Sequence, residues 1–171
     1  MIEEEFLQIS ADRLLQSVER IETCVRQLTP DQVWARASEN ENAVGNLLLH
    51  LAGNVRQWIL TGVGGAPDHR VRDTEFDARS SDDTPALLRN LRAAVEEAAG
   101  LIRHLPPAKL SEKLHVQVYD VTALGAIYHV VEHFSGHMFQ IILLTKMFTQ
   151  QDLGFYAHLK GHPANSDAKL P

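Results

Sequence analysis

Two histidines four residues apart, His133 and His137, have the spacing that most directly indicates chemistry in this chain. On an α-helix, side chains at i and i+4 lie one turn apart on the same face, so two imidazoles at this spacing can bind one metal ion. A third histidine, His50, lies in an apolar run (46–54) that is typical of a second helix. If the three converge, a divalent ion would keep an open coordination position, as in catalytic rather than structural sites.

Histidines are paired along this chain more often than chance predicts. The sequence contains nine of them, and three pairs have the i,i+4 spacing: His129/His133, His133/His137 and His158/His162. Random placement would give about half of one such pair. The last pair lies beside a glycine and a proline that would break a helix, which favours a solvated tail. For each helical histidine a simpler alternative stays open, namely a half-buried imidazole that is hydrogen-bonded to backbone or water.

Four long segments with helical periodicity must position these residues. They cover residues 2–28, 43–61, 84–105 and 123–148. Thr29 and Gln32 form a capping box with Pro30 at the first position, which predicts a short helix after the first segment. The polar stretch 66–83 predicts a long surface connection, and alternating residues at 114–119 predict a short extended piece. We therefore expect an all-α four-helix bundle with a short helix after the first long helix and a long crossover connection.

Helical geometry selects among the histidines. An ideal helix turns by about 100° per residue, so with His133 at 0°, His137 lies at about 40° and the apolar arc follows at roughly 60–120°. His129 lies at about −40°, further towards solvent. On the second helical segment, His50 also lies beside an apolar arc. These angles predict that His50, His133 and His137 meet at the edge of the bundle core, with His129 as an outer neighbour.

The bulk properties of the chain limit its classes of partner. Its 171 residues fit one domain, which we place at 1–160, followed by a polar tail at 161–171. The net charge of −6 and the lack of a basic block argue against nucleic acid or an anionic membrane as partner. The acidic N-terminus lacks the apolar region of a secretory signal, and no apolar run approaches the roughly 20 residues that span a bilayer. These features predict a cytoplasmic protein.

Other residues with chemical potential have simpler interpretations. Cys24 has no CxxC partner and lies among apolar helix positions, so we interpret it as a core residue rather than a nucleophile. The glycine-rich run 62–65 lacks a preceding strand and a following lysine, which favours a helix end over a phosphate loop. The acidic pair 82–83 is typical of a helix start. Asn54 and Gln140 fall near the candidate ligands and are candidates to orient the imidazoles, although ordinary boundary residues are the simpler alternative.

A longer pattern covers most of the chain, from about residue 28 to residue 157. It consists of residues 46–54, Trp58, 72–76, 133–141 and 152–156. Together these stretches resemble the DinB-like superfamily, which includes the bacillithiol- and mycothiol-dependent S-transferases. Within that superfamily the pattern is most similar to the DUF1572 branch.

This resemblance implies a four-helix bundle that carries a divalent metal ion, commonly nickel or zinc, on three histidines. The ligands of the family map onto His50, His133 and His137, the same residues that helical geometry selects. Members are often homodimers, which implies a homodimer here. One position departs from the pattern, because Phe139 stands where relatives usually have a small residue. Phe139 projects about 120° away from His133 on an ideal helix, so its effect is expected on local packing or on the dimer surface.

Two hypotheses for function follow. In the first, the protein is an enzyme whose metal activates a low-molecular-weight thiol for transfer to a small electrophilic substrate, or activates water in a hydrolase. The similarity to thiol S-transferases favours the thiol. In the second, the protein is a non-catalytic metal-binding or stress-related bundle, whose metal is structural or whose histidines are vestigial. Fold by itself does not decide between them.

Overall fold

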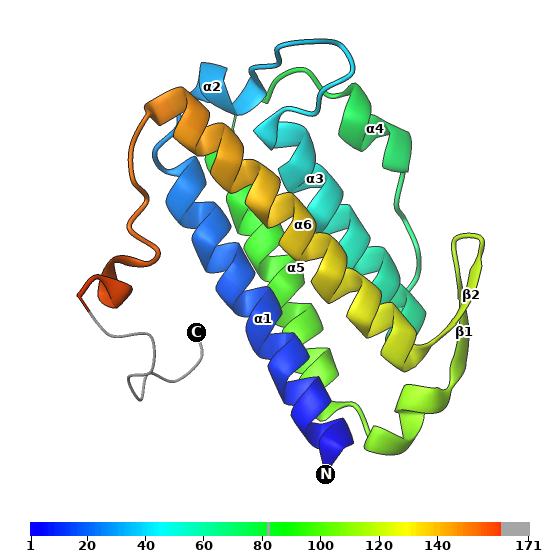
Figure 1. The fold of residues 1–171 in the computed structure, drawn as a ribbon. Coiled ribbons are helices and arrows are strands. Elements are labelled where there is room, and N and C mark those ends of the chain that lie inside the picture. Colours follow the sequence, from blue (N-terminus) through cyan, green and yellow to red (C-terminus); the bar gives the residue numbers. More distant parts are fainter. Residues whose placement is uncertain (82, 162–171) are drawn as a thin grey trace.

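The computed structural model describes residues 1–81 and 83–161, and four long helices dominate it (Figure 1). These are α1 (Ile2–Val25), α3 (Val44–Val55) with its continuation η1 (Arg56–Val63), α5 (Thr84–His104) and α6 (Ala123–Thr149). Helices α1 and α3 both pack against α5 and α6, which closes the bundle. The predicted all-α four-helix bundle is confirmed. In the described part of the chain, no helix combines the length and the apolar character needed to cross a membrane.

The helix boundaries follow the signals in the sequence. The short helix α2 (Pro30–Trp34) has the predicted capping box, in which the Gln32 backbone N–H donates to Thr29 Oγ1 over 3.2 Å. The Thr29 backbone N–H donates in turn to Gln32 Oε1 over 2.9 Å. Thr122 caps α6, and the side chain of Asp83 caps α5. The rest of the predicted tail after residue 161, with His162, lies outside the described residues, as does Asp82.

The long connection contains a helix that the sequence reading did not predict. Helix α4 (Arg72–Asp77) runs beside α3 on the outside of the bundle (Figure 1). A helix of this length is not stable alone. Its position is fixed by Asn46 on α3, whose side-chain amide donates to the backbone carbonyls of Glu75 and Ala78 over 2.8 and 3.0 Å. The predicted long surface connection is therefore present, and it includes a short helix whose order comes from α3 and not from its own sequence.

The predicted extended piece is half of an antiparallel hairpin. Strand β1 (Lys113–Val116) follows a short 3₁₀ turn, η2 (Pro107–Ser111), and pairs with β2 (Tyr119–Thr122). Gln117 at the turn has a positive φ of 57°, and its side-chain amide donates to Gln57 Oε1 over 2.6 Å. This hydrogen bond connects the hairpin to η1. A last 3₁₀ turn, η3 (Ala157–Leu159), follows α6 and contains His158.

The core of the bundle contains the apolar positions that the periodicity selected. Leu14, Val18 and Ile21 of α1 are fully or almost fully buried, and so is Phe134 of α6. Cys24 is also fully buried, and burial raises the pKa of its thiol, which confirms its interpretation as a core residue. Packing in the core thus fixes the position of α3 relative to α6, and this position determines whether the histidines of the two helices come into contact.

An ion pair between α1 and α5 yields a prediction for the pH dependence of stability. Arg92 donates from Nε and Nη2 to the two carboxylate oxygens of Glu22 over 2.6 and 2.8 Å. This pairing lowers the pKa of Glu22 below its ordinary value of 4.5. The stabilisation is therefore present above pH 4.5 and is lost as the pH falls through the lower, folded-state pKa. We expect Glu22→Gln to destabilise the protein by about 1 kcal/mol near neutral pH.

Denaturant titrations at several pH values test this assignment of the ion pair. The difference in unfolding free energy between the wild type and Glu22→Gln should shrink as the pH is lowered below 4.5. A difference that stays constant between neutral and acidic pH would contradict this assignment. Glu5, an exposed glutamate of α1 in no side-chain ion pair within the described residues, provides the control when replaced by glutamine.

Candidate metal centre

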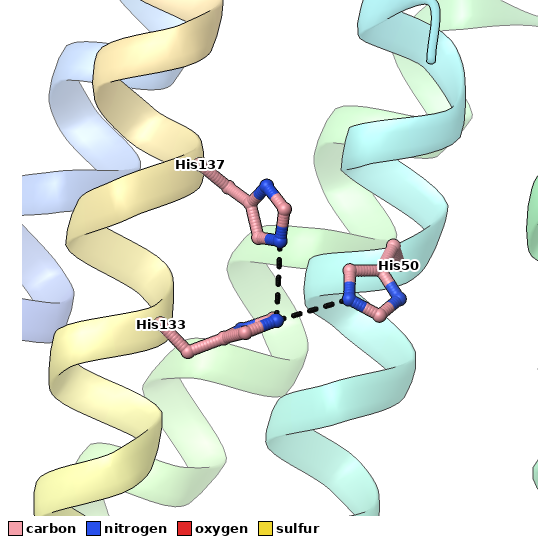
Figure 2. A group of neighbouring side chains, drawn as sticks. All are labelled: His50, His133 and His137. Atoms are coloured by element: carbon pink, nitrogen blue, oxygen red, sulfur yellow. Dashed lines mark hydrogen bonds between the residues drawn. The ribbon is translucent and has the colours of Figure 1, made fainter. Parts of the chain in front are cut away.

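Three imidazoles converge between α3 and α6, as Figure 2 shows. His50 Nε2 lies 3.0 Å from His133 Nε2, and His137 Nε2 lies 3.1 Å from the same atom. The three ligand nitrogens lie within 4.8 Å of one another. Among the residues that the structure describes, this is the one cluster of His, Cys, Asp or Glu side chains with such spacing. The convergence that helical geometry predicted is therefore present.

The hydrogen bonds formed by Nδ1 of His50 and of His137 determine whether Nε2 of each ring carries a proton. His50 Nδ1 lies 3.0 Å from Glu75 Oε2, and His137 Nδ1 lies 2.7 Å from Gln140 Oε1. Both of these partners are acceptor oxygens. Arg70 Nη2 also lies 3.1 Å from His50 Nδ1, but it donates to Glu75 Oε2 over the shorter distance of 2.8 Å. We therefore assign the proton of each ring to Nδ1, which leaves a lone pair on each Nε2. Gln140 thus orients a candidate ligand, which is one of the two roles that the sequence left open for it.

His133 cannot satisfy both of these lone pairs. A proton on its Nε2 can point towards His50 or towards His137, but one of the two contacts would still join two lone pairs. Its Nδ1 is buried and has no hydrogen-bond partner within the described residues. A cation at the centre would accept all three lone pairs. Zinc with nitrogen ligands at about 2.0–2.1 Å would separate those nitrogens by roughly 3.3 Å, close to the 3.0 and 3.1 Å by which His50 and His137 approach His133. The donor set therefore fits a divalent metal ion.

The environment keeps the imidazoles of His133 and His137 neutral, as metal ligands must be. Burial is the main cause that lowers the pKa of His133 to about 3, and the neighbouring side chains of His137, His50, His129 and Arg70 lower it further. Burial also lowers the pKa of His137, although the hydrogen bond to Gln140 opposes this effect. These two rings therefore carry no positive charge at neutral pH that would repel a cation.

The carboxylate that holds His50 was missed by the sequence reading. Glu75 lies on α4 and forms two hydrogen bonds with Arg70, from Nε to Oε1 over 2.7 Å and from Nη2 to Oε2 over 2.8 Å. Although burial opposes it, Arg70 and His50 hold the pKa of Glu75 below its usual value. Glu75 is therefore a buried anion that accepts from His50, an arrangement found behind many metal-binding histidines. The one available signal was that residues 72–76 belong to the stretches on which the family resemblance rests.

The remaining candidate residues surround the cluster without joining it. His129 stacks on Trp58 with ring centroids 4.2 Å apart, and it stays outside the group of three, as predicted. Asn54 contacts none of the three imidazoles by a hydrogen bond in the described structure, and its Oδ1 is buried without a partner. Phe139 is half exposed on another face of α6 and does not crowd the site.

A cavity of about 440 Å³ opens beside the cluster. His50 and His133 form part of its wall, together with Trp58 from η1 and Tyr119 from the hairpin. A larger cavity of about 720 Å³ lies between α1, α2 and α5 and contains none of the three histidines. The smaller cavity is the one that gives a small molecule access to the cluster.

Gly53 permits the close approach of the Arg70–Glu75 pair to α3. A Cβ atom at this position would overlap Glu75 Oε1 and come within 2.9 Å of Arg70 Nε. Helix propensity alone favours alanine over glycine by about 1 kcal/mol. We nevertheless expect Gly53→Ala to destabilise the protein by about 1–3 kcal/mol, since it displaces the pair, and to weaken metal binding through His50.

Calorimetric unfolding and metal titration would test this expectation. Gly100→Ala is the matched control, because Gly100 lies inside α5 and a Cβ there meets no atom within 4 Å. That variant should keep wild-type metal affinity and gain up to about 1 kcal/mol. A Gly53→Ala protein as stable as Gly100→Ala would contradict the close packing of Glu75 on α3.

Comparisons with known proteins show what this chain is similar to in sequence and in fold. A family model described as "Protein of unknown function (DUF1572)" matches residues 1–161. Among solved structures, the fold is similar to that of a DinB-like protein, YjoA, from Bacillus subtilis, with a TM-score of 0.64 and 13% sequence identity. That match covers 86% of this chain and 96% of YjoA. A search of curated proteins gave no match. At this identity, the structural similarity shows a DinB-like fold.

Proposed function

Since this chain belongs to the DUF1572 family and has a DinB-like fold, and since three of its histidines converge, we propose that it is a metal-dependent enzyme. His50, His133 and His137 are the proposed ligands of one divalent ion, nickel or zinc. The proposed reaction transfers a low-molecular-weight thiol to a small electrophilic substrate. Hydrolysis by activated water is the second enzymatic candidate.

In this proposal, the metal ion and the side chains around it have different chemical roles. A divalent ion with an open coordination position lowers the pKa of a bound thiol or water, which produces a nucleophile at neutral pH. Glu75 and Gln140 fix the tautomers of His50 and His137, so that both rings present Nε2 to the ion. Trp58 and Tyr119 form part of the wall of the cavity beside these groups.

One observation carries the metal assignment. The Nε2 lone pairs of His50 and His137 both face His133 Nε2, at 3.0 and 3.1 Å. Histidines that served only to fill a core boundary would each pair with backbone or water instead. The choice of a thiol as substrate rests on the resemblance to the S-transferases.

Metal analysis of protein purified without a His-tag tests the first part of the proposal. We expect about one nickel or zinc ion per chain, held at the three-histidine site. The loaded protein should consume 1-chloro-2,4-dinitrobenzene in a reaction that depends on added 2-mercaptoethanol. This activity should vanish in folded His137→Ala and persist in His104→Ala, whose imidazole is exposed on α5.

Three results would reject parts of the proposal. A metal-free protein whose properties are unchanged by His50→Ala would reject the metal centre. Thiol-dependent activity that survives in His137→Ala would reject the proposed site. A bound metal that raises the melting temperature without any thiol or hydrolytic reaction would favour the non-catalytic alternative, in which the metal is structural.

The proposal extends to a homodimer in the cytoplasm. Helix α6 exposes several large apolar side chains, Tyr128, Phe139, Leu143 and Met147, which supports an interface on this helix. We expect light scattering of the untagged protein to give twice the chain mass of 19.1 kDa. Phe139→Glu should shift the mass towards the monomer, whereas Ile9→Glu on α1 should not. A monomeric wild-type protein at micromolar concentration would contradict the dimer.

A further inference from the structure

The cavity beside the histidines has a charge that differs from that of the whole chain. The protein has a net charge of −6, yet the cavity wall contains two arginines, Arg70 and Arg72, and no aspartate or glutamate. The larger cavity, by contrast, combines arginines with Glu22 and Glu96. A divalent ion on the three histidines would add further positive charge. This distribution favours an anionic ligand.

The two arginines of this cavity differ in their pairing. Arg70 is buried and donates twice to Glu75, so its charge is compensated. Arg72 is exposed and pairs with no carboxylate among the described residues. Its guanidinium lies 4.6 Å from the centre of the Phe76 ring, and that ring lies 4.8 Å from the ring of His50. The uncompensated charge of the cavity therefore lies on Arg72, one aromatic ring away from a proposed metal ligand.

Two buried polar side chains in the wall also lack partners. Asn54 and Trp58 lie four and eight residues after His50, and both line the cavity. Each side chain is 3% exposed, and Asn54 Oδ1 and Trp58 Nε1 form no hydrogen bond within the described residues. Buried amide and indole groups are normally paired. Their position points to a polar ligand at this place.

On the basis of the proposed function, we propose that the substrate bound beside the metal is a small organic carboxylate. Arg72 binds the carboxylate, and the reactive end of the molecule faces His50 and His133. The cavity volume of about 440 Å³ suits a small molecule, and Tyr119 and Val121 provide an apolar wall for its carbon skeleton. The cavity suits a phosphate less well than a carboxylate. Phosphate sites also use the backbone N–H groups of a glycine-rich loop or of a long helix N-terminus.

The carboxylate can belong to either co-substrate, and matched probes separate the two. We would titrate zinc-loaded protein calorimetrically with 3-mercaptopropionate and its methyl ester, and with 3-phenylpropionate and 3-phenylpropanamide. In at least one pair, the acid should bind about tenfold more tightly than the neutral compound. The pair that shows the preference identifies the thiol or the electrophile as the carrier of the carboxylate.

Replacement of Arg72 decides the proposal. In Arg72→Met, the preference for the acid should fall to about twofold or less, while the neutral probes bind as before. Arg13→Met removes the same charge from an exposed position on α1 that does not line the cavity, and it should keep the preference. Equal binding of acid and neutral probe in both pairs, or a preference that survives in Arg72→Met, would overturn the proposal. Tighter binding of inorganic phosphate than of either acid would do so as well.

A spectroscopic readout separates this proposal from the proposed function. In cobalt-loaded protein, a thiol that binds the metal produces a thiolate-to-cobalt absorption band, and the methyl ester should produce it as well as the acid. An Arg72-dependent preference for acids without any such band would support the carboxylate site and reject thiol activation. The band without a preference for acids would support thiol activation and overturn the carboxylate site.

Discussion

His133→Ala is expected to abolish stoichiometric binding of zinc and nickel, with a loss of affinity of more than about 100-fold. Loss of a residue that only orients a ligand costs about 10–100-fold, so loss of the central ligand costs more. Wild-type protein at a metal concentration of 100 times Kd should gain about 2.7 kcal/mol in unfolding free energy, and the variant should gain none. Comparison of each protein with and without metal separates this effect from any change in the metal-free fold.

A neighbouring histidine supplies the control for this experiment. His129 lies one turn before His133 on α6 and stacks on Trp58, but its ring lies outside the converging group. His129→Ala should therefore retain one ion per chain and the full gain in stability on metal binding. Equal loss of metal in both variants would mean that the site is defined incorrectly.

Glu75→Ala is expected to impair metal binding and stability together. The substitution removes the acceptor from His50 Nδ1, which should weaken metal binding by about 10–100-fold. It also leaves Arg70 buried without its partner, and breaking a buried ion pair in this way costs about 3–5 kcal/mol. Arg70 and Glu75 side chains are only 5% and 9% exposed, so solvent offers little compensation.

Two further variants assign these losses to their causes. Glu75→Gln keeps an oxygen that can accept from His50 but removes the charge that Arg70 requires, so it should lose stability while keeping more metal affinity than Glu75→Ala. Asp73→Ala removes an exposed carboxylate from the same helix and should change stability by no more than about 0.5 kcal/mol. Metal titration of Glu75→Ala that matched the wild type would show that Glu75 does not act through His50.

The main features of the fold were predictable because they depend on local patterns. Apolar spacing located the four long helices, and Thr29 and the acidic pair at 82–83 marked two helix starts. Helix α4 was not predictable in this way. Its order comes from the amide of Asn46, which is distant in sequence and reaches the end of α4 from α3.

The three histidines of the site were predictable for the same reason. The carboxylate that orients His50 was not. The positions of His50, His133 and His137 follow from helical rotation on two regular helices. Glu75 reaches His50 from a polar stretch that has no strong periodicity, so no local pattern placed it near the cluster. Asn54, which local spacing did select, forms no hydrogen bond to a ligand in the described structure.

The dependence of α4 on the bundle has a consequence for dynamics. Glu75 joins His50 to the segment 70–78, so an ion that binds His50 more tightly when Glu75 is docked must also favour the docked segment. Thermodynamic reciprocity requires the two effects to be equal in free energy. Backbone amides of this segment should therefore exchange with deuterium more slowly in the loaded protein, and any partner that draws the segment away from α3 would promote release of the ion.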